Sequence, residues 1–274
     1  MMPLPLPPMP TDWEPTRATL HNYANAVGAI ARSHAVPHPK WWHISLKVRS
    51  TGLATETMPL PGGGTFDLRM DLRSHEVVME TSTGQRRTLS MSEGLTGTQF
   101  GNALIAILGE FGIEGEYVNE KFESDDTRQY VARDAEMFFS VLVNVSHNFE
   151  IHRLSLDGAI GPLQIWPHGF DVAFEWYGTK MVSHEEHGET TLMPAQVNLG
   201  FYPAGRPYFY SNPWPFETAT LTAVSLPAPA QWNTEGWEGS ILYYDDLLAS
   251  EDAPQKLLAY AKAVFEVAAP TLRS

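Results

Sequence analysis

The sequence predicts an α+β fold, with antiparallel sheets flanked by helices and two pseudo-symmetric halves as one interpretation of their order. Several short segments alternate apolar and polar residues with a period of two, which is typical of strands that bury one face. Longer segments carry apolar residues at helical spacing. Strands and helices come in blocks, which favours α+β over a doubly wound parallel sheet.

The first half is expected to open with a helix near Glu14-Pro15, because proline suits the first helical turn. Its apolar face consists of Leu20, Tyr23, Val27 and Ile30. Strands with alternating residues are expected at 43–49, 65–73, 75–81 and 85–91, and a closing helix at 98–111. These short-looped strands predict an antiparallel sheet.

The second half is expected to begin with a helix at 131–153 and to end with one that starts near 252–254. Between them, strands are expected at 170–177, 197–201 and 208–210, with a weaker strand at 221–226. Residues 178–194 are interpreted as a long loop, and long loops often form lids or binding sites. The resulting organisation is a flexible Pro-rich tail at 1–12, a first half at 13–112, an acidic linker or loop at 113–130 and a second half at 131–270.

The order of elements suggests an internal duplication. Each half has a long helix and then a Trp-x-His triplet that opens a strand: Trp41-Trp42-His43 and Trp166-Pro167-His168. If the halves are related, they superpose with His43 over His168, and both histidines could face a shared cleft. Chance is the alternative, since eight tryptophans and ten histidines permit accidental matches.

Composition narrows the function. The formal net charge is −14, from 32 acidic and 18 basic residues, which disfavours nucleic acid and anionic membranes as partners. There is no cysteine, so disulfides, thiolate metal sites and cysteine nucleophiles are excluded. The absence of cysteine and of a recognisable secretory signal favours a cytoplasmic location. The oligomeric state is not predicted.

Several short pieces together resemble an uncharacterised bacterial and fungal family, DUF5996. The pieces are Trp41-Trp42-His43, Gly52-Leu53, Phe66-Asp67, Gly169-Phe170-Asp171, Ser183-His184-Glu185 and Gly200-Phe201-Tyr202-Pro203. Their order spans the chain from about Trp13 to the last helix. The resemblance implies one continuous unit and carries no activity.

Histidines and carboxylates are the candidate catalytic residues, because they serve as general acids and bases. The set is His43, His168, Asp171, His184 and Glu185. A structural role is the alternative for each: a histidine packed by tryptophans, a polar pair at a strand start, and a solvated loop. Candidate ligand-binding residues are the aromatic side chains Trp42, Trp166, Trp214 and Tyr210.

A metal site is a further hypothesis. His184 and Glu185, in the dense run Ser183 to His187, are expected to fold back over the strand that carries His168 and Asp171. His168, His184 and Glu185 would then hold zinc, iron or manganese. The His-Glu-Glu-His order does not match the helical His-Glu-x-x-His zinc motif, and no Gly-x-Ser-x-Gly elbow supports a serine hydrolase. Paired-carboxylate glycoside hydrolysis is conceivable, but nothing selects a pair.

Two functions therefore remain. The first is an enzyme that acts on a small polar molecule through a pocket of histidines and carboxylates. The second is a non-catalytic small-molecule-binding or protein-interaction module that uses the aromatic segment from Tyr208 to Phe216. For that segment an exposed Trp214 is expected, because the flanking prolines exclude a central strand. A buried histidine–carboxylate cleft would favour the enzyme, and an exposed aromatic patch would favour the module.

Overall fold

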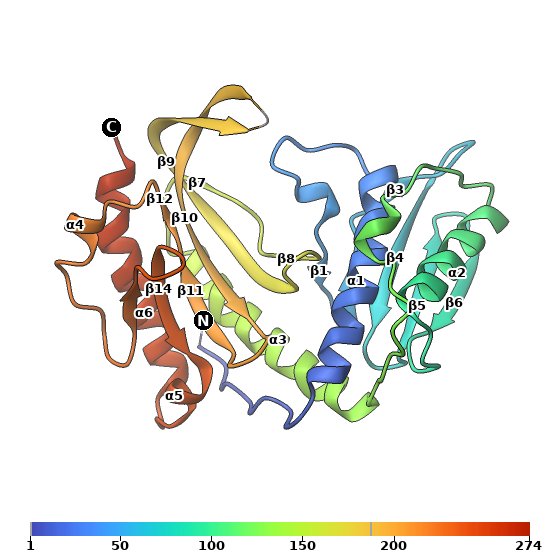
Figure 1. The fold of residues 1–274 in the computed structure, drawn as a ribbon, viewed down its shortest axis with the longest axis horizontal. Coiled ribbons are helices and arrows are strands. Elements are labelled where there is room, and N and C mark those ends of the chain that lie inside the picture. Colours follow the sequence, from blue (N-terminus) through green and yellow to red (C-terminus); the bar gives the residue numbers. More distant parts are fainter. Residues whose placement is uncertain (1, 187) are drawn as a thin grey trace. The chain divides into compact units, whose positions relative to one another are not determined.

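The computed structural model describes residues 2–186 and 188–274 and divides the chain into two compact units. The N-terminal unit comprises Pro7–Val143 and Gln164–Phe170. The C-terminal unit comprises the start of the chain to Leu6, Asn144–Leu163 and Asp171–Ser274. Helix α3 (Ala132–Arg153) contributes its first part to one unit and its second part to the other (Figure 1). The acidic stretch 113–130 lies inside the N-terminal unit, so these boundaries differ from the predicted halves.

Two helices form much of the N-terminal core. Helix α1 (Glu14–His34) buries its predicted apolar face, and Pro15 occupies its first turn. Helix α2 (Gly97–Glu110) begins with a capping box, in which Thr96 accepts from the Gln99 N–H and the Gln99 side chain accepts from the Thr96 N–H. The rings of Tyr23 and Phe100 stack between the two helices, with centroids 3.6 Å apart.

The N-terminal sheet is antiparallel throughout. Its strands are β1 (Lys47–Val48), β2 (Gly52–Ala54), β3 (Met58–Pro59), β4 (Thr65–Asp71), β5 (Glu76–Thr81) and β6 (Arg86–Ser90). The order is β1-β2-β4-β5-β6, with β3 paired to β4. On β4 the apolar residues Phe66, Leu68 and Met70 are buried, as the alternation predicts, and Asp67, Arg69 and Asp71 lie on the opposite face.

The predicted strand at 43–49 is wrong at its start. Residues 42–44 form the 3₁₀ turn η1 (Trp42–Ile44), and only Lys47–Val48 form a strand. The reason is the left-handed backbone of Trp41, whose φ of +59° turns the chain before the alternating residues begin. Leu46 then pairs with Ile165 of β8 (Gln164–Trp166), which is why this later segment belongs to the N-terminal unit.

The C-terminal unit holds a second antiparallel sheet and most of the remaining helices. Its strands are β7 (Ala159–Ile160), β9 (Asp171–Glu186), β10 (Glu189–Tyr202), β11 (Tyr208–Ser211), β12 (Pro213–Trp214), β13 (Gln231–Asn233) and β14 (Gly239–Tyr243). Their order is β13-β14-β11-β10-β9-β7, with β12 paired to β10. Its helices are α4 (Thr218–Leu221), α5 (Tyr244–Leu248), α6 (Ala253–Ala268) and η3 (Ala269–Leu272). The α+β fold with antiparallel sheets is therefore confirmed.

Two predicted elements of this unit are wrong. The described residues of the segment 178–194 do not form a loop, because 178–186 belong to β9 and 189–194 to β10, two strands that lie side by side in Figure 1. His184 of β9 pairs with Thr191 of β10. The segment's polar residues were misleading because a strand pair with little buried surface carries polar residues on both faces. The weak strand at 221–226 is also absent, since Leu221 ends α4 as a buried helical residue.

The predicted duplication does not hold. The N-terminal strands follow one another in sheet order, whereas in the C-terminal sheet β14 lies beside β11 and β13 takes the edge. His168 also belongs to the same unit as His43, so it cannot be the equivalent of His43 in a second copy. None of the described helices has both the length and the apolar character needed to cross a bilayer.

Candidate functional site

A cavity of about 260 Å³ opens in the N-terminal unit beside α1. Its lining residues are Asn25, Gly28, Ala29, Arg32, Trp41, Ile44, Lys121, Pro167 and His168. Four separate segments therefore build it: α1, the turn η1 with Trp41, the turn η2 (Asn119–Lys121) and the segment after β8. A cavity of this size suits a small molecule.

Small residues of α1 form the floor of this cavity. A Cβ atom on Gly28 would lie 2.7 Å from Cγ of Pro167, so only glycine lets the proline ring pack this closely on the helix. Ala29 is also buried. These lining residues are apolar, and the polar groups of the cavity are Asn25, Arg32, Lys121 and His168.

The rim holds an aromatic ring in a fixed position. The indole of Trp41 is 49% exposed, and the Arg32 guanidinium lies 4.9 Å from its centroid. The His43 ring stacks on Trp41 with centroids 5.5 Å apart. These contacts leave an exposed indole that a planar ligand could cover.

The cavity is locally cationic in an acidic protein. Arg32 and Lys121 line it, and none of its lining residues within the described chain is Asp or Glu. Neither cation has an ion pair to another described residue. Because acidic residues outnumber basic ones 32 to 18, two uncompensated cations at one cavity indicate a site for an anion.

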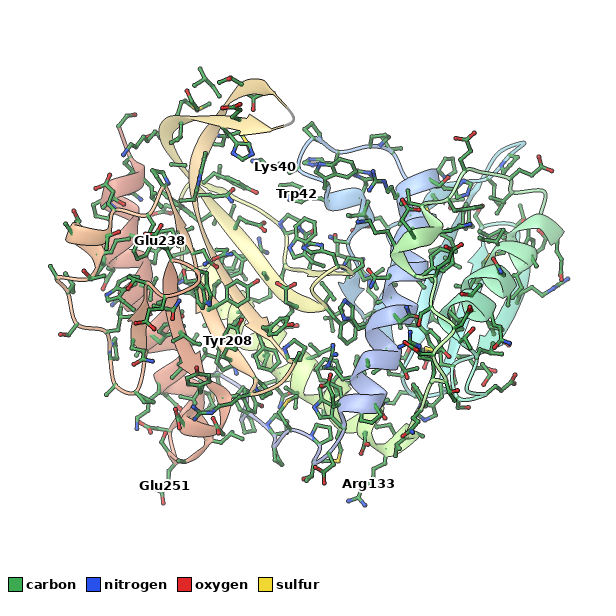
Figure 2. The ribbon with its side chains drawn as sticks, in the orientation of Figure 1. Lys40, Trp42, Arg133, Tyr208, Glu238 and Glu251 are labelled. Atoms are coloured by element: carbon green, nitrogen blue, oxygen red, sulfur yellow. The ribbon has the colours of Figure 1, made fainter. Side chains whose placement is uncertain are left out.

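His43 supports the rim and does not line the cavity. It is buried, and its Nδ1 accepts a hydrogen bond of 3.1 Å from the backbone N–H of His38. Burial lowers the pKa of His43, and nearby His38 and Arg32 lower it further. Trp42, a predicted ligand-binding residue that is labelled in Figure 2, stacks on the His38 ring with centroids 4.2 Å apart. Both predicted residues therefore hold the loop that presents Trp41.

His168 is the predicted catalytic residue that does reach the cavity. Its side chain is exposed on the rim, and its backbone carbonyl lies 3.1 Å from Nε2 of His21. The ring of Trp166, another predicted ligand-binding residue, lies 5.8 Å from the His168 ring.

Asp171 and Tyr210 meet in the C-terminal unit. The Tyr210 hydroxyl donates a short hydrogen bond to Oδ2 of Asp171. Burial, the Asp171 carboxylate and this hydrogen bond raise the pKa of Tyr210 well above its usual 10, so the phenol stays protonated. The ring lies against Gly200, where a Cβ atom would be 2.2 Å from Cζ of Tyr210. The sequence named both residues but not their pairing.

His184 and Glu185 are not brought to Asp171. All three stand on β9, and Asp171 begins this strand whereas Glu185 lies near its other end. At roughly 3.3 Å per residue, a straight strand would separate Asp171 from His184 by about 40 Å. The predicted fold-back is therefore wrong.

The predicted metal site has no support in the described chain, where no group of three or more His, Asp or Glu side chains is placed to hold a metal ion. His168 lies in the N-terminal unit and His184 and Glu185 in the C-terminal unit, so a metal shared among them stays a prediction. His187 lies outside the described residues. Elemental analysis of purified protein for zinc, iron and manganese tests it directly.

The aromatic segment from Tyr208 to Phe216 is only partly exposed. Trp214 pairs with Gln196 in the two-residue strand β12, is half-buried, and meets the His184 ring edge-on at 5.8 Å. Tyr208, labelled in Figure 2, lies beside the rings of Tyr202 and Trp237. Trp214 is therefore neither exposed as expected nor fully buried, and the interaction module stays a prediction.

A family model described as a family of unknown function, DUF5996, matches residues 6–273. The chain belongs to this family. No curated protein and no solved structure matches the chain significantly. The DUF5996 match covers both units, which confirms the resemblance, and it assigns no activity to any residue of the cavity.

Sequence reasoning missed the cationic residues of this DUF5996 cavity. Asn25, Gly28, Ala29 and Arg32 stand at positions i, i+3, i+4 and i+7 of α1, which places them on one stripe of the helix. The stripe of small and polar residues beside the apolar face of α1 was therefore the sequence signal that could have indicated a cavity here. The contribution of Lys121 has no comparable signal, because its turn lies about 90 residues further along the chain.

Proposed function

We propose that the protein binds a small organic anion in the cavity beside α1. One observation carries this proposal: Arg32 and Lys121 converge on a cavity whose described lining contains no carboxylate. Arginine favours planar carboxylate and phosphate groups, to which it can donate two parallel hydrogen bonds. The exposed indole of Trp41 would cover the planar part of such a molecule.

The apolar floor sets a second requirement for the ligand. Gly28, Ala29, Ile44 and Pro167 offer no charge, so the part of the molecule that enters deepest is apolar or aromatic. An arylcarboxylate or an aryl phosphate meets both conditions. Benzoate and phenyl phosphate are therefore suitable probes, and benzyl alcohol is the neutral control.

Replacing Arg32 and Lys121 together by glutamine is expected to weaken the binding of phenyl phosphate by roughly 100-fold, since two charge-assisted contacts of about 1.5 kcal/mol each are lost. Isothermal titration calorimetry on the full chain measures this loss. Arg133→Gln changes an exposed arginine at the start of α3 that does not line the cavity, and it should leave the affinity unchanged. Equal affinities of the double variant and the wild type would contradict the proposal.

A second candidate function is an enzyme that acts on the bound molecule. The observation that favours it is His168, which lines the same cavity and could accept or donate a proton. His168→Gln separates the two candidates. For an enzyme, this variant keeps the affinity for the anion and loses the chemical conversion of the ligand, which one-dimensional proton NMR follows.

A further inference from the structure

A second and larger cavity, of about 450 Å³, lies on the open face of the N-terminal sheet. It is lined by the β1–β2 turn, the chain after β2 and the polar face of β4. The residues are Arg49, Ser50, Thr51, Ala54, Thr55, Glu56, Thr57, Asp67, Arg69 and Asp71. All its lining residues except Ala54 are polar or charged, and it shares no residue with the cavity beside α1.

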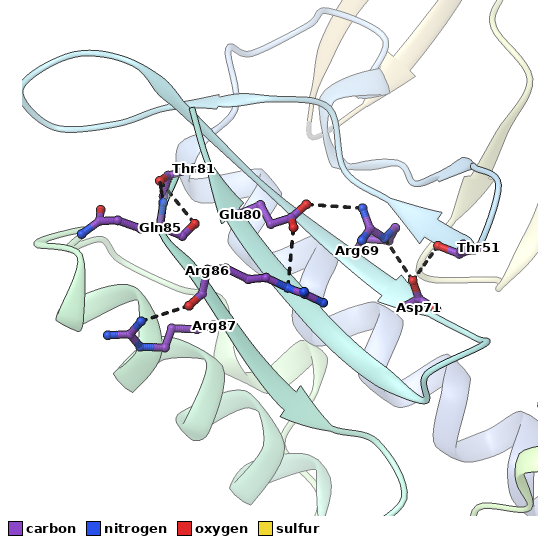
Figure 3. A network of polar contacts seen from close by, with 8 residues as sticks. All are labelled: Thr51, Arg69, Asp71, Glu80, Thr81, Gln85, Arg86 and Arg87. Carbon is purple, nitrogen blue, oxygen red and sulfur yellow. Dashed lines mark hydrogen bonds and ion pairs between the residues drawn. The ribbon is translucent and has the colours of Figure 1, made fainter. Parts of the chain in front are cut away.

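Most of its charged groups already have partners. Asp71 accepts from the Thr51 hydroxyl at 2.6 Å (Figure 3). It also accepts from the backbone N–H groups of Arg73 and Ser74 at 3.0 Å. Arg69 lies 3.3 Å from Asp71 and 3.6 Å from Glu80. These groups therefore form a closed network on the sheet.

The remaining arginine is partly engaged as well. Arg49 lies 4.0 Å from Glu56, and both side chains are about half exposed. A pair at that distance in water is weak. Neither arginine of the cavity is therefore free of a carboxylate neighbour, which distinguishes them from Arg32 and Lys121.

Asp67 is different, because it has no hydrogen-bond or ion-pair partner among the described residues. It is half-buried in the middle of β4, where its cross-strand neighbour is Glu80. Burial raises the pKa of Asp67, the charge of Glu80 adds to this, and Arg69 and Arg49 only partly oppose it. The fold thus keeps a carboxylate where ionisation is costly.

Asp71 shows that a raised carboxyl pKa is not common to every carboxylate on this face of the sheet. The two residues are four apart on β4 and project from the same side of the sheet. The pKa of Asp71 is lowered and that of Asp67 is raised. Neighbouring carboxyls whose pKa values are shifted in opposite directions are found at sites with a task beyond stability.

We propose that this cavity binds a small polar molecule through an ammonium or guanidinium group that pairs with Asp67. Three of its lining residues are anionic, namely Glu56, Asp67 and Asp71, and two are cationic, Arg49 and Arg69, so the lining carries one net negative charge. A cationic group would give Asp67 the ion-pair partner that it lacks. An anion would instead compete with Glu80 and Asp71 for Arg69. The hydroxyl of Thr57, which is exposed, offers an acceptor to the cationic group.

The test uses agmatine, which carries both a guanidinium and an ammonium group, on the full-length protein. Carboxyl-detected NMR of the aspartate side chains should show a saturable shift of Asp67, and the Kd should be at least 10-fold weaker for Asp67→Asn. Asp125→Asn removes an exposed aspartate of the same unit and should bind like the wild type. Absence of saturation up to about 10 mM agmatine, or equal binding by Asp67→Asn, would overturn the proposal.

Stability gives an independent readout that does not depend on the probe. A raised folded pKa means that the folded state holds the proton more tightly, so stability falls as the pH rises through that pKa. At neutral pH, Asp67→Asn is therefore expected to raise the Tm by about 2–4 °C, because it removes an uncompensated charge and keeps the shape. A lower Tm would show that Asp67 stabilises the fold, and it would contradict the proposal that the Asp67 carboxylate pairs with a ligand instead.

Discussion

Replacing Asp71 by alanine is expected to lower the free energy of unfolding by about 3 kcal/mol, since a buried acceptor of several hydrogen bonds is removed. Asp71 is 6% exposed, and its two oxygens hold the Thr51 hydroxyl and the backbone N–H groups of Arg73 and Ser74. These donors would be left without an acceptor in the β4–β5 turn and in the β1–β2 turn. Urea denaturation monitored by circular dichroism measures the loss.

The effect of Asp71 should also depend on pH. Burial alone would raise its pKa, but the hydrogen bonds from Thr51, Ser74 and Arg73 outweigh burial and lower the pKa below its ordinary 3.8. The carboxylate therefore stabilises the fold above that value, and the contribution is lost as the pH falls through the lower folded pKa. The difference between wild type and Asp71→Ala should shrink in strongly acidic solution. Two results would contradict the role given to Asp71. One is a difference in the free energy of unfolding between wild type and Asp71→Ala that stays constant into strongly acidic solution. The other is a difference no larger than the one that Asp125→Ala causes.

The sequence predicts β4 well because its two faces have different surroundings. Phe66, Leu68 and Met70 must be buried, so their period of two leaves a single register. The same reasoning fails for the far part of the β9–β10 hairpin, where burial alternates only between half-buried and exposed. There the half-buried positions include the polar residues Lys180 and His184. It fails for Trp41 because a left-handed non-glycine residue has no composition signal.

The candidate sites were harder to predict than the fold, because they depend on contacts between distant segments. Pro167 packs on Gly28 and completes a cavity floor, although 139 positions separate them in the sequence. His43 was predicted to be catalytic because of its imidazole, yet in the structure its ring stacks on Trp41. Asp67 stood in the resemblance to DUF5996 without any role. In the structure, its lack of hydrogen-bond partners and its lower burial distinguish it from Asp71. Chemical type alone therefore does not separate a supporting residue from one available to a ligand.

Acidification from pH 6.5 to 4 is expected to remove about 3 kcal/mol of stability through His152 alone. This residue lies in the C-terminal part of α3, is 7% exposed, and faces the rings of Phe174 and Phe265. Burial lowers the pKa of His152 to about 4. The unfolded chain, with a pKa near 6.5, then binds the proton more readily than the folded chain. Stability is therefore complete above pH 6.5 and falls progressively toward pH 4.

His152→Leu should remove this part of the acid sensitivity, because leucine keeps the apolar contacts and carries no titratable group. Urea denaturation at pH 7 and at pH 4.5 gives the free energy of unfolding for both proteins, and the difference between them isolates His152 from other titrating groups. His147→Leu is the matched control on the same helix, since it retains His152 and loses only the contact of 3.0 Å between its Nε2 and the Met2 carbonyl. If wild type and His152→Leu lose the same free energy between the two pH values, His152 is not held neutral by the surrounding rings, and the packing of α3 against β9 and α6 would have to admit a charged imidazole.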